Sequence, residues 1–145
     1  MTTPRQPLLR MPIAADVALI PLITVGALLG LHRDGVEELV DQGEWPWVFD
    51  LRTGKGTIRE LRVWRGCFGK AECGMRNAEL KAVVADVIGT TTGDVRGAML
   101  ETRWQVSNQT LRRLLHNGDI RGRMTGHTLW LERESLAEFL GRRRS

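Results

Sequence analysis

Two stretches of the chain, 31–43 and 106–118, align without gaps at a constant offset of 75 and share one pattern of hydrophobic and polar positions. The apolar residues of the two stretches are Leu31, Val36, Leu39 and Val40, and Val106, Leu111, Leu114 and Leu115. This spacing places apolar side chains on one face of an α-helix. Each stretch ends in a glycine, Gly43 or Gly118, where a closing helix needs a residue of positive φ. The chain therefore contains an internal repeat with an amphipathic helix in each copy.

The same elements flank this helix in both copies. A shorter helix precedes it, over 24–29 in the first copy and roughly 97–104 in the second, and a tight turn joins the two helices. A β-hairpin follows, over 47–64 in the first copy and 120–130 in the second. The first hairpin is longer by about nine residues. Two helices joined by a tight turn and followed by a hairpin predict a winged helix-turn-helix.

A third helix closes each copy, over 77–88 with Asn77 as the candidate N-cap, and over 132–140. These elements predict a mainly α fold with small β-hairpins, of the α+β class, made of two tandem winged helix-turn-helix domains. The predicted boundaries are 1–18 for an N-terminal arm, 19–89 for copy one with an extended wing and C-terminal helix, 90–95 for a linker, and 96–145 for copy two with a basic tail.

The second copy resembles a known group of DNA-binding proteins. Its string QVSNQTLRRLLHNGDI at 105–120, followed after a short hairpin by LWLERESLAEFL at 129–140, is similar to the winged helix-turn-helix of phage excisionases and the related MerR-type regulators. The string LITVGALLGLH at 22–32 is similar to the first helix and turn of the same group. Copy two departs from the pattern at Trp104 and Gln105, where a small apolar residue and a glycine are usual. The resemblance implies DNA binding by a recombination directionality factor or a transcriptional regulator.

Charge is distributed unevenly along the chain. The whole chain carries 21 basic and 17 acidic residues, a net charge of +4. Residues 1–95 hold 11 basic and 12 acidic side chains, whereas residues 96–145 hold 10 basic and 5 acidic ones. A positive field confined to the last third of the chain indicates a polyanionic partner for copy two.

The polar face of the second helix of copy two carries the residue types that read base edges. Asn and Gln pair with adenine, and Arg pairs with guanine, in the major groove. The free amides at the helix N-terminus can hold a phosphate, and Ser107 is a good N-cap. The predicted contacts on this helix are Ser107, Asn108, Gln109, Thr110, Arg112, Arg113 and His116. In the wing they are Arg121, Arg123 and His127, facing the minor groove or the backbone, with the basic tail 142–144 adding non-specific attraction.

Copy one has different chemistry in the equivalent helix, because Glu37, Glu38 and Asp41 would face phosphates and repel them. Its candidate DNA contacts are Arg33 at the helix start and the wing residues Arg52, Lys55, Arg59 and Arg62. Lys55, at the hairpin tip, is the best candidate for the minor groove. Two interpretations of copy one stay open. It is a second DNA module acting mainly through its wing, or a copy that serves dimerisation or a partner protein.

The five tryptophans are predicted to fill the core, and Trp47 is expected to be the least buried of them. No phosphate-cradling glycine loop or nucleophile motif is present, so the chain is not expected to be an enzyme. The spacing of Cys67 and Cys73 and the scattered histidines predict no metal site, and no cofactor is expected. Asp16 interrupts the apolar stretch 11–31, which favours a cytoplasmic protein over an exported or membrane-bound one.

The sequence thus predicts a sequence-specific double-stranded DNA-binding protein that reads the major groove with the second helix of copy two. The alternative is a protein-interaction adaptor or assembly component that recruits a partner through the acidic helix of copy one. A homodimer or a cooperative oligomer on DNA, and a recombinase or other protein partner, remain open, as does the choice between regulation and recombination.

Overall fold

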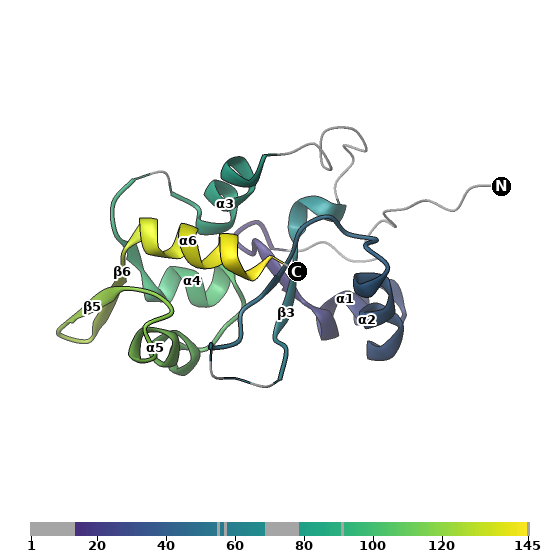
Figure 1. The fold of residues 1–145 in the computed structure, drawn as a ribbon, viewed down its shortest axis with the longest axis horizontal. Coiled ribbons are helices and arrows are strands. Elements are labelled where there is room, and N and C mark those ends of the chain that lie inside the picture. The colour runs from purple at the N-terminus through teal and green to yellow at the C-terminus, as the bar shows by residue number, and fades with distance from the viewer. Residues whose placement is uncertain (1–13, 55, 57, 69–78, 91, 145) are drawn as a thin grey trace.

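The computed structural model describes residues 14–54, 56, 58–68, 79–90 and 92–144. They form a mixed α+β structure in which one order of elements occurs twice (Figure 1). The first repeat contains β1 (Leu19–Pro21), α1 (Leu22–Leu29), α2 (Arg33–Asp41), β2 (Val48–Asp50), β3 (Leu61–Trp64), the short 3-10 helix η1 (Arg65–Phe68) and α3 (Leu80–Ile88). The second repeat contains β4 (Val95–Arg96), α4 (Gly97–Arg103), α5 (Asn108–His116), β5 (Gly122–Thr125), β6 (Thr128–Leu131) and α6 (Arg133–Arg143).

Each repeat builds a three-stranded antiparallel sheet with the same topology. The orders are β1-β3-β2 and β4-β6-β5, so the strand before the first helix pairs with the returning strand of the hairpin. In the first sheet Val63 lies between Ile20 and Val48. In the second, Leu131 lies between Val95 and Gly122. The sequence analysis missed β1 and β4, because two or three residues are too few to show the alternation of a strand.

The amphipathic helices form where the repeat pattern predicts them. Ser107 caps α5, since its Oγ accepts a hydrogen bond from the Thr110 N–H at 3.1 Å. His32 occupies the equivalent position before α2 and makes no side-chain cap. Gly43 and Gly118 follow the two helices with φ of 75° and 81°, the left-handed conformation that glycine adopts without strain. The predicted helix ends are therefore confirmed.

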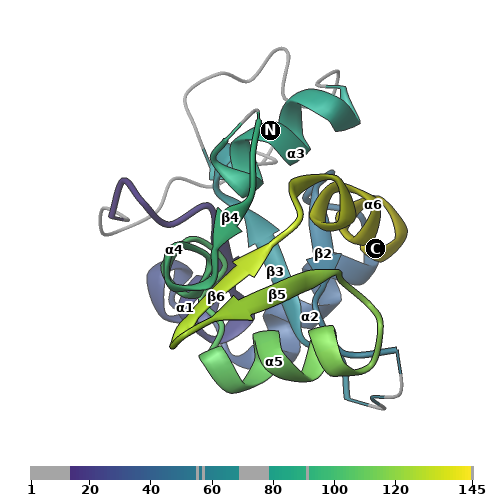
Figure 2. The same ribbon diagram turned by 90° about the vertical axis from the view of Figure 1, so that its left-hand side faces the viewer.

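The two repeats pack against each other around one continuous hydrophobic core. Helices α3 and α6 lie side by side (Figure 2). The fully buried Trp104 stacks on Phe139 of α6, with ring centroids 6.3 Å apart, and donates a hydrogen bond to the carbonyl of Val87 in α3 at 3.0 Å. The contact between repeats, rather than the connecting segment 90–95, thus fixes where one repeat lies relative to the other.

Two predictions are corrected by this packing. Trp47, expected to be the least buried tryptophan, is only 2% exposed and lies under the guanidinium of Arg144, 3.7 Å from the ring centroid. The residues 142–144 do not form a free basic tail. Arg142 and Arg143 belong to α6, and Arg144 donates to the carbonyl of Pro46 in the first repeat at 2.8 Å. The aromatic face of Trp47 and the Pro46 carbonyl oxygen both attract the Arg144 cation, so these contacts stabilise the C-terminal residues against the first repeat.

The third helices and the first hairpin also differ in extent from the prediction. Helix α3 has Glu79 at its N-cap position, and the predicted cap Asn77 lies outside the described residues. In the first hairpin, strands β2 and β3 are short, and the connection between them runs from Leu51 to Glu60. The Leu51 N–H donates to the Glu60 carbonyl at 3.0 Å and closes this connection at its base.

Candidate nucleic-acid interface

Helix α5 presents a polar face to solvent opposite its core-facing side. Leu111 and Leu114 are completely buried. The predicted contacts Gln109, Arg112, Arg113 and His116 are exposed, and Ser107, Asn108 and Thr110 lie at the helix start, with Asn108 and Thr110 half-buried. One face of one helix therefore brings together the predicted base-reading residues.

Arg112 and Arg113 differ from the other arginines predicted to contact DNA. Within the part of the chain that the structure describes, neither guanidinium makes an ion pair, a hydrogen bond or an aromatic contact. A cation without an internal partner keeps its full hydrogen-bonding capacity for an external anion, because no protein contact has to be broken first. Among the arginines predicted to contact DNA, these two are the ones whose guanidinium has no partner within the described residues.

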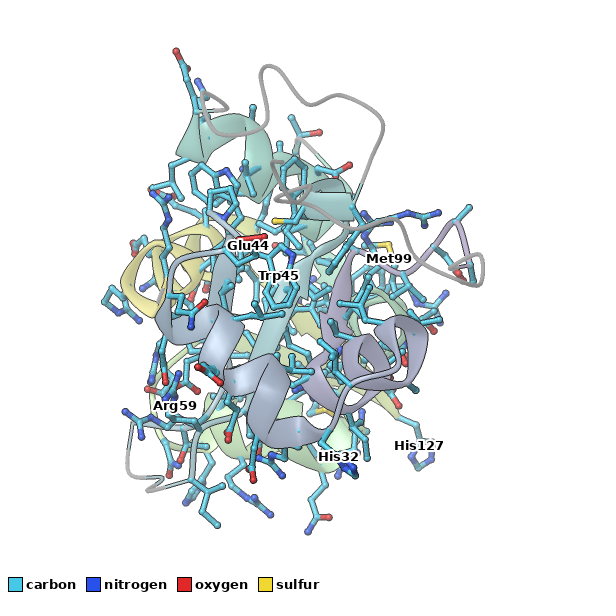
Figure 3. The ribbon with its side chains drawn as sticks, turned by 90° about the vertical axis from the view of Figure 1, so that its right-hand side faces the viewer. His32, Glu44, Trp45, Arg59, Met99 and His127 are labelled. Carbon is cyan, nitrogen blue, oxygen red and sulfur yellow. The ribbon has the colours of Figure 1, made fainter. Side chains whose placement is uncertain are left out.

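The hairpin β5–β6, predicted to be the wing of the second repeat, extends away from the body of the molecule (Figure 1). His127, in its turn, lies at the edge of the molecule in Figure 3. His127 is exposed. Arg121 lies 3.3 Å from a carboxylate oxygen of Glu132 and 3.6 Å from one of Glu138, and its hydrogen bond to Glu132 raises its pKa.

The other wing arginine, Arg123, pairs with Asp94. Ion pairs this exposed contribute little to stability. Arg121 and Arg123 can therefore exchange their carboxylates for phosphates.

Helix α2 is a charge-inverted counterpart of α5. At the repeat offset of 75, Glu37 and Glu38 occupy the positions of Arg112 and Arg113. Glu38 is exposed, and Glu37 is half-buried with an oxygen 3.7 Å from Arg33 Nε. This face repels a polyanion, so the two repeats present opposite electrostatic surfaces from equivalent helices.

Arg52 and Arg59 of the first hairpin pair with carboxylates of their own repeat, and the Arg59 pair is exposed. Arg52 lies 3.2 Å from Asp50, and Arg59 lies 3.6 Å from Asp41. Lys55 lies outside the described residues. The Gly54 N–H donates to the carboxylate of Asp119 in the second repeat at 3.0 Å. This hairpin therefore contacts the second repeat instead of extending freely as a wing.

Arg62 is the predicted DNA contact whose placement differs most from the expectation. Its guanidinium donates to the carbonyls of Trp104 at 3.2 Å, Gln105 at 2.9 Å and Leu61 at 3.1 Å. Burial lowers the pKa of Arg62, and the nearby Glu60 opposes that shift. With its donors directed at backbone carbonyls of both repeats, Arg62 is a structural contact and not a free ligand for phosphate.

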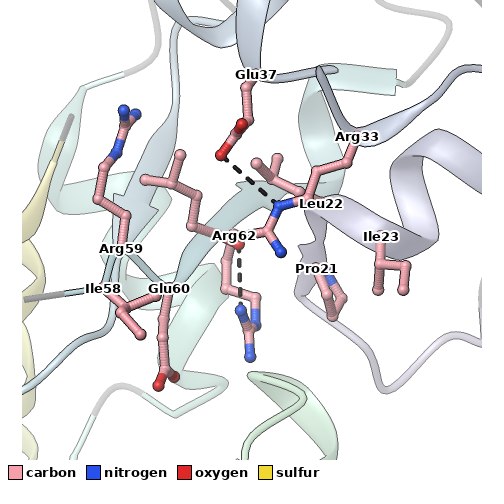
Figure 4. A pocket seen from close by; sticks show the side chains of 10 residues that line it. Pro21, Leu22, Ile23, Arg33, Glu37, Ile58, Arg59, Glu60 and Arg62 are labelled. Carbon is pink, nitrogen blue, oxygen red and sulfur yellow. Dashed lines mark hydrogen bonds and ion pairs between the residues drawn. The ribbon is translucent and has the colours of Figure 1, made fainter. Parts of the chain in front are cut away.

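Sequence reasoning missed a groove of about 320 Å³ on the first repeat (Figure 4). Ile23 of α1 and Ile58 of the first hairpin stand on its sides with 77% and 75% of their surface exposed. The charged lining includes Arg33, Glu37 and Glu60. Isolated apolar residues in the sequence carry no signal of exposure, since pattern analysis assigns them to the core.

Among the described residues, no group of three or more histidine, cysteine or acidic side chains is arranged to hold a metal ion. None of the helices described is both long and apolar enough to span a bilayer. No protein-family model, no curated protein and no solved structure matches the chain.

Proposed function

We propose that the protein is a sequence-specific double-stranded DNA-binding protein built from two tandem winged helix-turn-helix repeats, in which α5 enters the major groove. The carrying observation is the pair Arg112 and Arg113, exposed and internally unpartnered on a helix that buries its other face. A B-DNA major groove about 12 Å wide accepts one such helix. Each bidentate pair between a guanidinium and a guanine contributes about 1 to 3 kcal/mol of base discrimination.

The surroundings of α5 support the same orientation. The helix begins at a capped N-terminus, whose free amides can bind a phosphate. His127 lies in the turn of the β5–β6 hairpin, from which we expect it to contact the minor groove or the backbone. Glu38 of α2 would be repelled by a duplex, so the second repeat supplies the contact with bases.

The biological role that fits this proposal is that of an excisionase-like recombination directionality factor or a transcriptional regulator in the cytoplasm, as the resemblance of the second repeat implies. The shared hydrophobic core supports a single preformed DNA-binding body, because the described parts of the two repeats are already packed together before binding.

Salt dependence tests the proposal directly. Wild-type protein is titrated into labelled duplexes selected from a random pool, and anisotropy is measured at 50 and 200 mM salt. If Arg121 and Arg123 of the β5–β6 hairpin each neutralise one phosphate while Arg112 and Arg113 contact bases, affinity falls about 12-fold over this range. Absence of duplex binding at 50 mM salt, or affinity that does not respond to salt, would overturn the proposal.

The groove beside α2 favours a second candidate, an adaptor that binds a partner protein through the first repeat. Its exposed Ile23 and Ile58 would hold an apolar side chain, and the acidic Asp34, Glu38 and Asp41 would attract basic residues beside it. The partner is therefore a basic segment with an apolar anchor. Ile23→Asp would abolish such binding and leave duplex affinity unchanged, whereas the adaptor is rejected if Ile23→Asp has no effect on any protein partner identified for the wild type.

A further inference from the structure

The turn between α4 and α5 is held by the first repeat. Three consecutive carbonyls of this turn accept hydrogen bonds from it. The Arg103 carbonyl accepts from the Ala18 N–H at 2.8 Å, the Trp104 carbonyl from Arg62 Nε at 3.2 Å, and the Gln105 carbonyl from Arg62 Nη2 at 2.9 Å. Carbonyls at the end of a helix lack intrahelical donors, so these bonds satisfy groups that the second repeat cannot satisfy alone.

Gln105, in the same turn, is the one non-glycine residue with a left-handed backbone among the residues that the structure describes. Its φ is 53°, a conformation that is unfavourable for residues with a Cβ. The equivalent position of the first repeat, 75 residues earlier, is Gly30, with φ of 73°. The first repeat therefore makes its turn with glycine, whereas the second makes it with a strained residue held from outside.

Arg62 is well placed to hold that residue. It belongs to β3, the central strand of the first sheet, and its backbone is paired with Pro21 and Phe49 on either side. A guanidinium offers several donors in a fixed plane, so one side chain can reach two successive carbonyls, which a lysine ammonium cannot do with the same geometry. The support of the turn thus comes from a rigid element.

The other end of α5 is also held by the first repeat. Asp119, which follows the helix, accepts from the Gly54 N–H at 3.0 Å. Arg143 of α6 lies 3.3 Å from the same carboxylate and keeps it in place. Contacts from the first repeat thus bracket α5 at its start, through Arg62, and just beyond its end, through the hairpin connection.

We infer that the first repeat acts as a brace that fixes the orientation of α5 on DNA, and that Arg62 is a positioning residue of the DNA-reading site. This inference depends on the proposed function for its effect on binding. It gives the longer hairpin of the first repeat a role other than contact with DNA, and it explains why the turn of the second repeat tolerates Gln105 where its counterpart has glycine.

The test compares Arg62→Lys with Arg96→Lys, the same change at an exposed strand arginine that is not among the predicted DNA contacts. Affinity is measured for a selected duplex and for a random duplex at several salt concentrations. Arg62→Lys should reduce the ratio of specific to random affinity about 5- to 10-fold, in the usual range of coupling between sites, with the salt slope unchanged. Arg96→Lys should leave the ratio at its wild-type value. An unchanged ratio in Arg62→Lys would overturn the inference.

Rescue separates positioning from a general loss of stability. Adding Gln105→Gly to Arg62→Lys should restore most of the ratio, because glycine adopts the left-handed turn without a brace. A merely destabilised protein would lose affinity for both duplexes equally and would not be rescued in this specific way. Failure of the rescue in a folded double variant would count against the inference.

Hydrogen exchange keeps the inference testable if wild-type protein binds no duplex, a result that would defeat the proposed function alone. In that case the Val106 and Leu111 amides, which donate to the carbonyls of Glu101 and Ser107, should exchange faster in Arg62→Lys than in Arg96→Lys. Equal exchange rates in the two variants would refute the role of Arg62 in holding the turn, whatever the protein binds.

Discussion

Replacing Trp104 by alanine should destabilise both repeats together. The Trp104 side chain is fully buried, stacks on Phe139, and donates to the Val87 carbonyl. Truncating a buried tryptophan costs about 3 to 5 kcal/mol. The Val87 carbonyl would still accept from Arg103 Nε at 3.3 Å, so it would not be left without a donor, and we expect a value near the middle of this range, about 4 kcal/mol. A domain of this size has a total stability of about 5 to 15 kcal/mol.

Urea unfolding monitored by circular dichroism gives the loss of stability in Trp104→Ala. Hydrogen exchange shows which parts of the protein are destabilised. The hydrogen-bonded amides of Val36 in the first repeat and Leu111 in the second should lose the same free energy of opening, because one core joins the repeats. Trp130→Ala is the control, since this ring is half-buried on the second hairpin and should cost only about 1 to 2 kcal/mol. Wild-type protection at Val36 alongside lost protection at Leu111 would refute a shared core.

Three further substitutions probe single features of the fold. Ser107→Ala removes the cap of α5 and should lower the unfolding free energy by about 1 kcal/mol in urea, and no change would mean that the cap is not formed in solution. Gly122→Ala would place a Cβ against the Trp130 carbonyl oxygen, so its melting temperature should fall more than that of Gly141→Ala, whose Cβ would make an ordinary contact with Leu80 Cδ2 at 3.9 Å, and the reverse order would contradict the pairing of β5 with β6. Arg144→Ala should lower stability by about 1 kcal/mol and leave the salt slope of duplex binding unchanged, whereas a smaller slope would restore Arg144 to the DNA-contacting residues.

The parts of the fold visible in the sequence are those with a local cause. The spacing of apolar residues predicts the helices α2 and α5, and Gly43 and Gly118 predict where they end. Ser107 could be assigned as a cap because its partner is three residues away. The exposed face of α5 follows from the same periodicity, since burying Leu111 and Leu114 leaves Arg112 and Arg113 facing solvent.

The features of the fold that the sequence did not predict depend on contacts between residues far apart in the chain. Arg62 and Arg144 look like surface charges in the sequence, and only the packing of one repeat on the other directs them to backbone carbonyls 42 and 98 residues away. The burial of Trp47 depends on the same packing, because Arg144 covers its ring. The Trp104–Gln105 departure from the usual turn was visible, but its compensation by a guanidinium from β3 was not.

The most direct test of DNA reading by α5 compares two double variants at equivalent positions of the repeat. Arg112→Ala/Arg113→Ala removes the cations of α5, and Glu37→Ala/Glu38→Ala removes the corresponding carboxylates of α2. Binding to a selected duplex is measured at one fixed salt concentration. If α5 reads DNA, the first variant loses at least about 30-fold in affinity and its preference for the selected sequence, while the second binds as well as wild type or better. Retained sequence-specific binding by Arg112→Ala/Arg113→Ala would show that α5 is not the reading helix.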